Sequence, residues 1–384
     1  MSNKVAIGYR PTWAEVNLNY LGHNFKKIKS LLHKQTKVLV TVKADAYGHG
    51  LIPVAKKLVA CGLDYLGVAS IDEGIKLRRA GIKKPILILG LVLKEDIKPL
   101  FTYRLIPAVC DLQLARALNA QAGIFKQIIP VHIKIDTGMG RIGVLPGEAF
   151  GLVTDIYKLK NIQIQGIFTH FPLADSDHKF TTRQIRLFDK LVMDLKKSGI
   201  NIPLVHTANS IGLIKHRNSH FNMVRPGLVI YGLHPKKNLG LKLKPVLSLK
   251  TRVVFIKQVG PHVGISYGLT YVTARSTCIV TLPIGYGDGY PRNLSNLGWL
   301  LIGGRRFRVS GRVCMDQIMV DVGNFKPKIG DEVVLIGKQG EQQVTAEELA
   351  ELSGTISYEI VCGLGSRIPR IYINEQTAYG AIAT

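Results

Sequence analysis

Short runs rich in valine and isoleucine alternate with amphipathic stretches through the first 231 residues. This alternation is typical of parallel strands joined by helices, and eight such units close a β/α barrel of the TIM type. The sequence therefore predicts an α/β fold that begins with an eight-stranded barrel. The expected strands are Lys37–Ala44, Tyr65–Ser70, Pro85–Gly90, Leu105–Cys110, Val131–Asp136, Ile162–His170, Leu204–Asn209 and Met223–Tyr231.

Two of the stretches between these runs begin with residues that commonly cap helices. Ser70 is followed by Asp72 and Glu73, and Asp111 precedes the segment LQLARAL. A serine or aspartate side chain accepts a hydrogen bond from a free N–H group of the first helical turn. We therefore expect crossover helices to start at both positions.

The pattern changes after about Pro245, where strands alternate with glycine-rich turns. A chain of 384 residues also exceeds what one hydrophobic core usually serves. We predict a barrel domain over residues 1–242 and a mainly β domain over residues 243–384, with an N-terminal strand, 12–18, that pairs with the second domain. The second domain is expected to contain strands Leu247–Val259, Ser276–Ile284, Phe307–Val313, Ile318–Val322 and Glu332–Ile336, and one short helix, Thr345–Leu352.

Cysteine usage and the N-terminus indicate the compartment. The cysteines lack C-x-x-C spacing and are odd in number, which argues against disulfides and against a zinc site. We expect buried, reduced thiols and no metal. No apolar run approaches the roughly 18 residues of a membrane span, and the first residues do not resemble a secretory signal. We therefore expect a cytoplasmic protein without membrane contact.

The charge is unusually basic. The chain has 51 Lys and Arg against 26 Asp and Glu, a net charge of +25 that would attract polyanions. The basic residues form short clusters spread over the whole chain, without aromatic interleaving or a zinc-finger or homeodomain motif. We interpret them as a basic surface rather than a nucleic-acid site, and keep a nucleic-acid partner as an alternative.

Lys43 stands at the end of the first predicted strand and precedes the turn Asp45–Gly50. In a β/α barrel the chemistry lies at the carboxyl ends of the strands. A lysine there either extends its ammonium into water or serves as a partly desolvated, nucleophilic amine that forms a Schiff base. Position alone leaves both interpretations open.

The motif VKADAYGHG around Lys43 resembles the cofactor-lysine motif of the alanine racemase family. Further matches to that family follow in the same order along nearly the whole chain. They are KIDTGMGRIG (134–143), FTHF (168–171), HTANS (206–210), RPGLVIYG (225–232), SYG (266–268), IGYGDG (284–289), GRVCMDQ (311–317) and SYEIVCGLGSRIPR (357–370). One such motif would be weak evidence, but collinear matches are specific.

The resemblance implies a pyridoxal 5'-phosphate enzyme that interconverts L-alanine and D-alanine and supplies D-alanine for peptidoglycan. It also implies a homodimer in which the partner's second domain completes each active site. Lys43 would carry the cofactor and act as the base for the D enantiomer, and Tyr267 would act on the opposite face. Without the other motifs, Tyr267 could equally be a tyrosine that fills a turn.

The family assigns further roles around the cofactor. Arg225 would contact the pyridine nitrogen, although an arginine there could instead pair with a surface acid. The phosphate would bind to backbone N–H groups and to hydroxyls. The cofactor-binding residues implied are Lys43, Tyr47, His170, Asn209, Ser210, Arg225, Gly227, Leu228 and Tyr358.

The substrate carboxylate would bind to Arg141 and to the backbone N–H of Met315, and His170 and Arg141 would lie in the network of Tyr267. Lys134 sits where many relatives carry a carbamylated lysine, but an unmodified lysine is the alternative. Supporting positions are Lys134, His206, Cys314 and Asp316. The entry gate, which would limit the substrate to alanine, matches Tyr286 and Tyr358 and, further out, Arg292, Arg312 and Asp175.

Two other functions fit the same barrel. A decarboxylase of a basic or diamino acid would be expected to place a glutamate at the pyridine nitrogen, and Arg225 stands against it. Proteins that carry the cofactor without turnover lack a second domain, which this chain is predicted to have.

Overall fold

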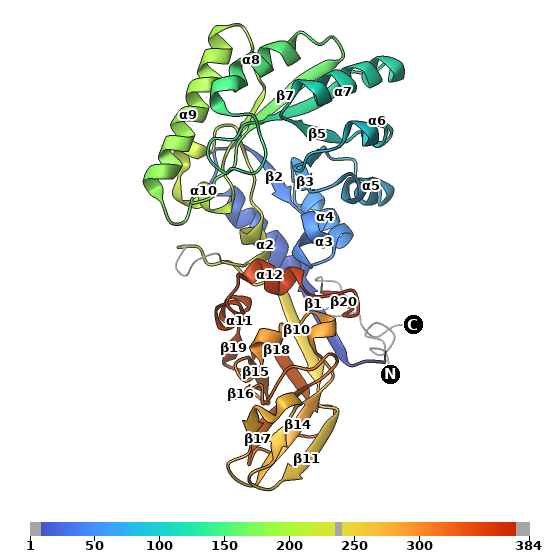
Figure 1. Ribbon diagram of the computed structural model, residues 1–384, viewed down its shortest axis with the longest axis vertical. Coiled ribbons are helices and arrows are strands. Elements are labelled where there is room, and N and C mark those ends of the chain that lie inside the picture. The colour runs from blue at the N-terminus through green and yellow to red at the C-terminus, as the bar shows by residue number, and fades with distance from the viewer. Residues whose placement is uncertain (1–8, 235–239, 374–384) are drawn as a thin grey trace.

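The computed structural model describes residues 9–234 and 240–373 and consists of a barrel above a sheet-rich domain (Figure 1). Eight parallel strands close the barrel in chain order, and Lys37 pairs with Met223 at the closure. The predicted eight-stranded barrel is confirmed. Its strands are β2 (Lys37–Thr41), β3 (Tyr65–Val68), β4 (Ile86–Ile88), β5 (Ile106–Val109), β6 (Ile129–Lys134), β7 (Ile162–Phe168), β8 (Leu204–His206) and β9 (Met223–Val224).

Helices surround the barrel, and both predicted caps are present. Ser70 accepts a hydrogen bond from the N–H of Glu73 at 3.4 Å, and Asp111 accepts one from Leu114 at 2.7 Å. The helices are α2 (Leu18–Lys29), α3 (Lys43–Tyr47), α4 (Leu51–Ala60), α5 (Ile71–Arg79), α6 (Lys98–Thr102), α7 (Leu112–Phe125), α8 (Pro146–Tyr157), α9 (His178–Lys197) and α10 (Ser210–Lys215), with short 3-10 turns η1 (Lys94–Asp96), η2 (Arg217–Ser219) and η3 (Leu228–Tyr231).

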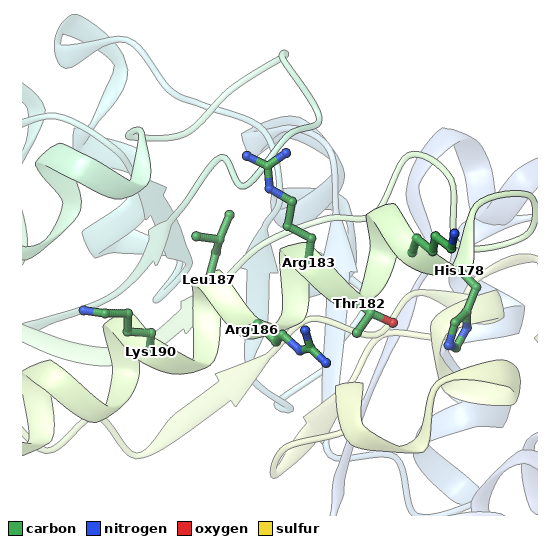
Figure 2. A pocket seen from close by; sticks show the side chains of 7 residues that line it. His178, Thr182, Arg183, Arg186, Leu187 and Lys190 are labelled. Atoms are coloured by element: carbon green, nitrogen blue, oxygen red, sulfur yellow. The ribbon is translucent and has the colours of Figure 1, made fainter.

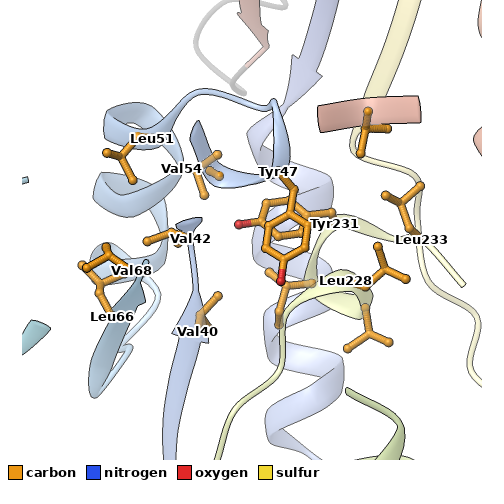
Figure 3. Packing of buried hydrophobic residues seen from close by; sticks show 14 of the residues in the cluster. Val40, Val42, Tyr47, Leu51, Val54, Leu66, Val68, Leu228, Tyr231 and Leu233 are labelled. Atoms are coloured by element: carbon orange, nitrogen blue, oxygen red, sulfur yellow. The ribbon is translucent and has the colours of Figure 1, made fainter. Parts of the chain in front are cut away.

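Two apolar layers hold the barrel together. Side chains that point outward from the strands pack against the helices, and Figure 3 shows Val42 and Val68 beside Leu51 and Val54 of α4. Side chains that point inward fill the barrel axis. This inner cluster consists of Leu39, Tyr65, Leu87, Ile106, Leu204 and Met223, with Leu89 packed against it. The amino-terminal part of the barrel is therefore a packed core rather than a channel.

The last predicted barrel strand is wrong over most of its length. Only Met223 and Val224 form β9, and after Pro226 and Gly227 the chain enters the 3-10 turn η3. Proline has no N–H group to donate to a sheet, so the ladder cannot continue through it. The hydrophobic run 228–231 is buried as a turn instead.

The second domain is built on a seven-stranded sheet with the order β16-β15-β18-β10-β1-β20, and β19 pairs with β18. A three-stranded sheet, β11-β14-β17, and the pair β12-β13 complete it. The strands are β1 (Thr12–Asn17), β10 (Leu247–Arg252), β11 (Phe255–Val259), β12 (Gly264–Ile265), β13 (Tyr271–Val272), β14 (Thr277–Leu282), β15 (Trp299–Ile302), β16 (Arg305–Arg308), β17 (Ile318–Gly323), β18 (Glu332–Gln339), β19 (Gln342–Val344) and β20 (Arg370–Ile373).

Strand β1 lies in this sheet, antiparallel to β10 and parallel to β20. The domain also contains helices α11 (Ala346–Ser353) and α12 (Ser357–Cys362) and the turns η4 (Tyr267–Leu269), η5 (Tyr286–Asp288) and η6 (Arg292–Leu294). The domain boundary at residue 242 stays a prediction, and the outermost residues of both predicted domains, 1–8 and 374–384, lie outside the described residues.

Several sequence-based boundaries in this domain are wrong. The run 247–259 is not one strand, because it divides at Val253 into β10 and β11, which belong to different sheets. The strand predicted from Phe307 ends at Arg308. Helix α12 and strands β15 and β20 were not predicted, since each is too short to show a clear hydrophobic period.

The cysteine prediction holds only in part. All five cysteines are free thiols, but only Cys278 is buried, while Cys362 is exposed and the other three are partly buried. In the described part of the chain, no helix is both long enough and apolar enough to cross a bilayer.

Asp288 anchors the loop that carries Tyr286. Its carboxylate is fully buried and accepts two hydrogen bonds from Arg10, at 2.5 and 2.7 Å, and one from the N–H of Gly285 at 2.9 Å. Arg367 approaches it at 3.4 Å. The charge is therefore paired on more than one side, which a buried carboxylate requires.

Replacement of Asp288 by asparagine should lower the free energy of unfolding by about 3 kcal/mol, because it leaves Arg10 without its charged partner. Urea denaturation followed by the fluorescence of Trp13 and Trp299 measures this, since both lie in the seven-stranded sheet. The matched control is Asp194→Asn, which breaks only an exposed ion pair with Lys190 and should leave the midpoint unchanged. Equal midpoints for both variants would contradict the anchor.

Candidate active site

A cavity of about 500 Å³ opens at the carboxyl ends of the barrel strands. Its wall combines strand-end residues of the barrel with α12 of the second domain. Among the described residues its lining carries four cationic side chains and no carboxylate. The lining includes eleven of the predicted site residues, Lys43, Tyr47, Lys134, Arg141, His170, Asn209, Ser210, Arg225, Gly227, Leu228 and Tyr358.

The turn after Lys43 has an unusual backbone. Ala44, Asp45, Ala46 and Tyr47 all have φ between +53° and +55°, so α3 is a left-handed turn. Such a conformation costs L-residues roughly 1–2 kcal/mol each, and strain of this kind clusters at functional sites. The Glu73 carboxylate contacts the start of this turn and accepts a hydrogen bond from the N–H of Ala44 at 2.7 Å.

Gly48 ends this turn with φ +77° and brings α12 against the barrel. A Cβ atom here would lie 2.1 Å from the carbonyl oxygen of Val361 in α12. Only glycine permits both the backbone angle and this approach. The contact lets Tyr358 of α12 reach the cavity wall, with its ring 5.9 Å from that of Tyr47.

The Lys43 amine is half-buried. Burial and the charge of Arg141 lower its pKa, while Glu73 and Cys362 raise it and oppose them in part. A lysine whose pKa is lowered has more neutral amine at physiological pH, and the neutral amine is the nucleophile and the base.

Arg225 lies at the bottom of the cavity and is buried without a carboxylate among its hydrogen-bond partners. Its two terminal nitrogens donate four hydrogen bonds, to the carbonyls of Thr169, His206 and Thr207 and to Nδ1 of His206. The Nε–H group takes no part in these and remains available to a ligand. Burial lowers the pKa of Arg225 to about 9, so it stays charged at neutral pH.

A second group of donors gathers at another part of the wall. The N–H of Gly227 donates to Oγ of Ser210 at 3.0 Å, and a Cβ atom on Gly227 would lie 2.7 Å from the hydroxyl of Tyr47. Burial raises the pKa of Tyr47, and burial with the charge of Asp175 raises that of Tyr358 to about 12. Both phenols are therefore protonated donors at neutral pH.

Asn209 and His170 also line this wall, but the Asn209 amide is hydrogen-bonded within the protein and the His170 ring is neutral. The Asn209 side chain accepts a hydrogen bond from Gly212 at 2.9 Å and donates one to the carbonyl of Phe171 at 3.2 Å. Its amide is thus engaged in holding the start of α10. Burial, followed by the charge of Arg225, lowers the pKa of His170 well below its ordinary value, which makes this imidazole neutral.

These features fit pyridoxal phosphate. The cavity offers an amine for its aldehyde, a charged donor for its ring nitrogen and a cluster of hydroxyl and N–H donors for its phosphate. An anionic ligand would also offset the unpaired positive charge, because buried charges are stable only when paired. In the described residues no group of three or more potential metal ligands occurs.

Lys134 is a buried lysine beside Arg225. Its Nζ donates to the carbonyl of Ile135 at 2.9 Å and lies 5.4 Å from the centre of the Phe168 ring. Burial, followed by the charge of Arg225, lowers its pKa to about 7. About half of the amine is therefore uncharged at neutral pH.

Most of the remaining predicted residues lie on the second domain, whereas His206 ends β8 and Asp175 precedes α9 on the barrel. Tyr267 is 71% exposed and Met315 is 53% exposed, and with Cys314 and Asp316 they line a separate surface hollow. Within one chain, Tyr267 does not line the cavity of Lys43.

Hydrogen bonds assemble the surface around Tyr267. Ser266, with φ +67°, donates through Oγ to the carbonyl of Arg312 at 2.6 Å. The N–H of Tyr286 donates to the carbonyl of Cys314 at 3.0 Å. Arg292 is exposed on η6 and is not part of either lining.

Sequence reasoning missed four contributors. The sequence identifies Glu73 only as an acidic residue of the first helical turn and Cys362 only as a thiol, although Cys362 lines the cavity. Phe168 stacks on His206 with ring centres 5.0 Å apart, and His132 donates to or accepts from His206 at 2.8 Å. The inward position of His132 on its strand, two residues before Lys134, was the available signal.

A further cavity lies on α9 and is lined by His178, Lys179, Thr182, Arg183, Arg186, Leu187 and Lys190 (Figure 2). All of these side chains project from one helix. They offer positive charge but no nucleophile paired with a base. We therefore place the candidate active site at the end of the barrel.

Comparison with known proteins gives consistent matches. Residues 16–235 match the family described as "Alanine racemase, N-terminal domain", and residues 246–372 match "Alanine racemase, C-terminal domain". The alanine racemase of Halothermothrix orenii is 50% identical over 370 residues, which covers 95% of this chain and 98% of the relative.

Solved structures agree. That of an alanine racemase from Clostridium difficile 630 has a TM-score of 0.92 at 41% identity and covers 96% of this chain and 97% of that one. The alanine racemase from Bacillus anthracis, solved with bound L-Ala-P, has a TM-score of 0.89 at 36% identity and covers 96% of both chains.

The buried amine of Lys134 should make stability depend on pH. Its pKa is about 7 in the folded chain and about 10.4 when unfolded, so the unfolded chain binds more protons between these values. The loss of folding stability caused by burying the Lys134 amine is complete below pH 7 and disappears as the pH rises toward about 10. Lys134→Met should therefore unfold at a higher temperature than the parent at about pH 6, and the difference should shrink by about pH 10. Thermal melts in bicarbonate-free buffer test this; a difference independent of pH would contradict it.

Proposed function

The chain belongs to the alanine racemase family, and we propose that it interconverts L-alanine and D-alanine by passing the α-proton between Lys43 and Tyr267. The enzyme is an amino-acid racemase of the isomerase class. The observation that carries the proposal is the Lys43 amine, with its lowered pKa, in a cationic cavity at the carboxyl end of the barrel. Its product D-alanine would serve peptidoglycan synthesis in the cytoplasm.

The family uses pyridoxal phosphate, which when bound provides an electron sink for the negative charge left on the substrate carbon after the proton departs. Lys43 would hold its aldehyde carbon. Arg225 would donate its Nε–H to the ring nitrogen without giving up its proton, since a guanidinium is a far weaker acid than a pyridinium. The phosphate would be bound by Tyr47, Ser210, Gly227, Leu228 and Tyr358, with His170 and Asn209 lining the site.

Two proton carriers on opposite faces of the substrate carbon allow racemisation without turning the substrate over. The Lys43 amine takes or returns the proton on the D side, and the Tyr267 hydroxyl does so on the L side. Arg141 and the backbone N–H of Met315 would bind the carboxylate, which fixes the α-carbon between them. His206, Cys314 and Asp316 support these groups.

We further propose that Lys134 is carbamylated. Carbon dioxide reacts only with a neutral amine, and the lowered pKa of Lys134 supplies one at neutral pH. The carbamate would carry a negative charge close to Arg141 and Arg225, both of which act on Lys134 electrostatically. It would hold Arg141 in place for the substrate.

The substrate gate would consist of Tyr286 and Tyr358, with Arg292, Arg312 and Asp175 further out. Two aromatic side chains at the entry leave room for a methyl side chain and exclude larger ones. The nearest rival, a decarboxylase on the same barrel, would require an acid at the ring nitrogen, and Arg225 makes no hydrogen bond to one.

We propose a homodimer with shared active sites. Tyr267 and Met315 are exposed on the second domain, and the cavity of Lys43 within one chain contains no residue of that surface. A partner's second domain over the barrel mouth would supply the missing proton carrier and bury the exposed side chains. Catalysis would then depend on dimer formation.

Lys43→Ala should lose racemase activity by at least about 10³-fold, because it removes both the covalent attachment and one proton carrier. The measurement is conversion of L-alanine to D-alanine with added pyridoxal phosphate. Borohydride should fix the cofactor to the parent chain and not to this variant. Lys76→Ala, at an exposed lysine of α5, is the matched control and should behave as the parent. Cofactor fixed in Lys43→Ala would remove the assignment.

Tyr267→Phe should lower activity by about 10²–10⁴-fold. When it is mixed with Lys43→Ala and the subunits are allowed to exchange, each mixed dimer regains one intact site. About a quarter of the parent activity should return after random exchange of equal amounts. Racemase assays before and after exchange measure this, and an unchanged rate would exclude sites shared between subunits.

A further inference from the structure

We propose that His132 and Gln165 are positioning residues, which hold the Arg225 guanidinium in one orientation through His206. The four side chains form a line inside the barrel beneath the cavity, from the end of β9 through β8 to β6 and β7. His132 and Gln165 do not line the cavity, so they act only through their neighbours. The proposal rests on the proposed function in one respect, that Arg225 is the contact for the cofactor ring.

The contacts along the line are short and buried. Nη1 of Arg225 lies 2.9 Å from Nδ1 of His206, and Nε2 of His206 lies 2.8 Å from Nδ1 of His132. Both imidazoles are inaccessible to solvent. The Phe168 ring stacks on His206 at 5.0 Å with an interplanar angle of 1°, and its edge contacts His132. Packing therefore fixes the planes of both imidazoles.

The direction of each hydrogen bond follows from the arginine. A guanidinium only donates, so Nδ1 of His206 must be unprotonated and accept. Burial and the charge of Arg225 lower the pKa of His206 well below its ordinary value, so the ring carries a single proton, on Nε2. That proton is donated to Nδ1 of His132, which leaves the His132 proton on its own Nε2 because burial lowers the pKa of that ring to about 3.

Gln165 is the acceptor available to this last proton. Nε2 of His132 and Oε1 of Gln165 are both buried without a hydrogen-bond partner in the described residues. The two side chains are close enough for Gln165 to raise the pKa of His132 as an acceptor, although their geometry falls short of a complete hydrogen bond. A small rotation of the amide would satisfy both atoms, whose unpaired burial is otherwise costly.

The backbone is built around this pair. The register between β6 and β7 passes from Val131 opposite Ile164 to His132 opposite Gly166, so Gln165 is the extra residue of a β-bulge. Bulges re-aim side chains and are frequent beside active sites. Gly166 makes room for the imidazole, because a Cβ atom there would lie 2.4 Å from Nδ1 of His132.

The line therefore has one consistent direction, from Arg225 to Gln165. Reversing either imidazole tautomer would set two N–H groups against each other at the arginine or between the histidines. Both terminal nitrogens of Arg225 already donate hydrogen bonds within the protein, so only its Nε–H is left to bind a ligand. His132 is needed because without it the buried Nε2–H of His206 loses its acceptor, and His206 is free to reorganise.

The test compares His132→Leu, which cannot accept a hydrogen bond, with His132→Gln, whose amide oxygen can. His132→Leu should weaken binding of pyridoxal phosphate, measured by absorbance titration, roughly tenfold, as expected for one orphaned buried donor. It should also raise the ratio of cofactor transamination to alanine racemisation. His132→Gln should restore most of the cofactor affinity and most of the parent's ratio of transamination to racemisation. The matched control is His216→Leu, a buried histidine that contacts the carbonyl of Ala174 and has no link to Arg225.

A second measurement does not depend on a variant or on turnover. ¹⁵N-histidine NMR of the cofactor-loaded parent protein should find His206 and His132 neutral, each with its proton on Nε2. A proton on Nδ1 of His206 would overturn the proposal. So would a His132→Leu variant that binds pyridoxal phosphate as tightly as the parent and has the same ratio of transamination to racemisation. If the tautomers are as expected but alanine is not racemised, the proposed function fails while the hydrogen-bonded line stands.

Discussion

The structure depends on a concentration of positive charge at one end of the barrel. Lys43, Lys134, Arg141 and Arg225 line a single cavity in which the described residues provide no carboxylate. Lys134 and Arg225 are buried, and like charges in a partly dry site repel strongly. An anionic ligand would relieve this repulsion, so the cavity favours anions before any specific hydrogen bond is counted.

Burial, together with the same charge, sets the protonation states of the other groups. Burial acts first in every case, and Arg225 adds to it, so Lys134, His170 and His206 all have lowered pKa values. Amines become partly neutral and therefore reactive, while imidazoles become neutral connectors that transmit orientation rather than charge. Arg225 itself remains the fixed cation because a guanidinium keeps its proton even when burial lowers its pKa to about 9.

The barrel and the residue types of the cavity could be predicted from sequence, because strand periodicity and motif spacing report local structure. Met223–Tyr231 was misassigned since a hydrophobic run does not distinguish a strand from a buried turn, and Pro226 was the overlooked signal. The left-handed turn at Ala44–Tyr47 was not predicted, because alanine, aspartate and tyrosine rarely adopt positive φ and give no sequence signal for it. Likewise, the role of His132 arises from a β-bulge between two strands, and a bulge has no reliable sequence pattern.

The two proposed proton carriers would have opposite structural requirements, which would explain why they stand on different domains. Lys43 must be desolvated to supply a neutral amine, and a barrel end closed by α12 provides that environment. In the proposed mechanism Tyr267 would approach from the other face of the ligand. A turn on the second domain, held by Ser266 against Arg312 and backed by the Asp288 anchor of the neighbouring loop, presents it outward. An exposed phenol on a rigid turn can act only against another surface, and in the proposed dimer the partner's cavity would provide that surface.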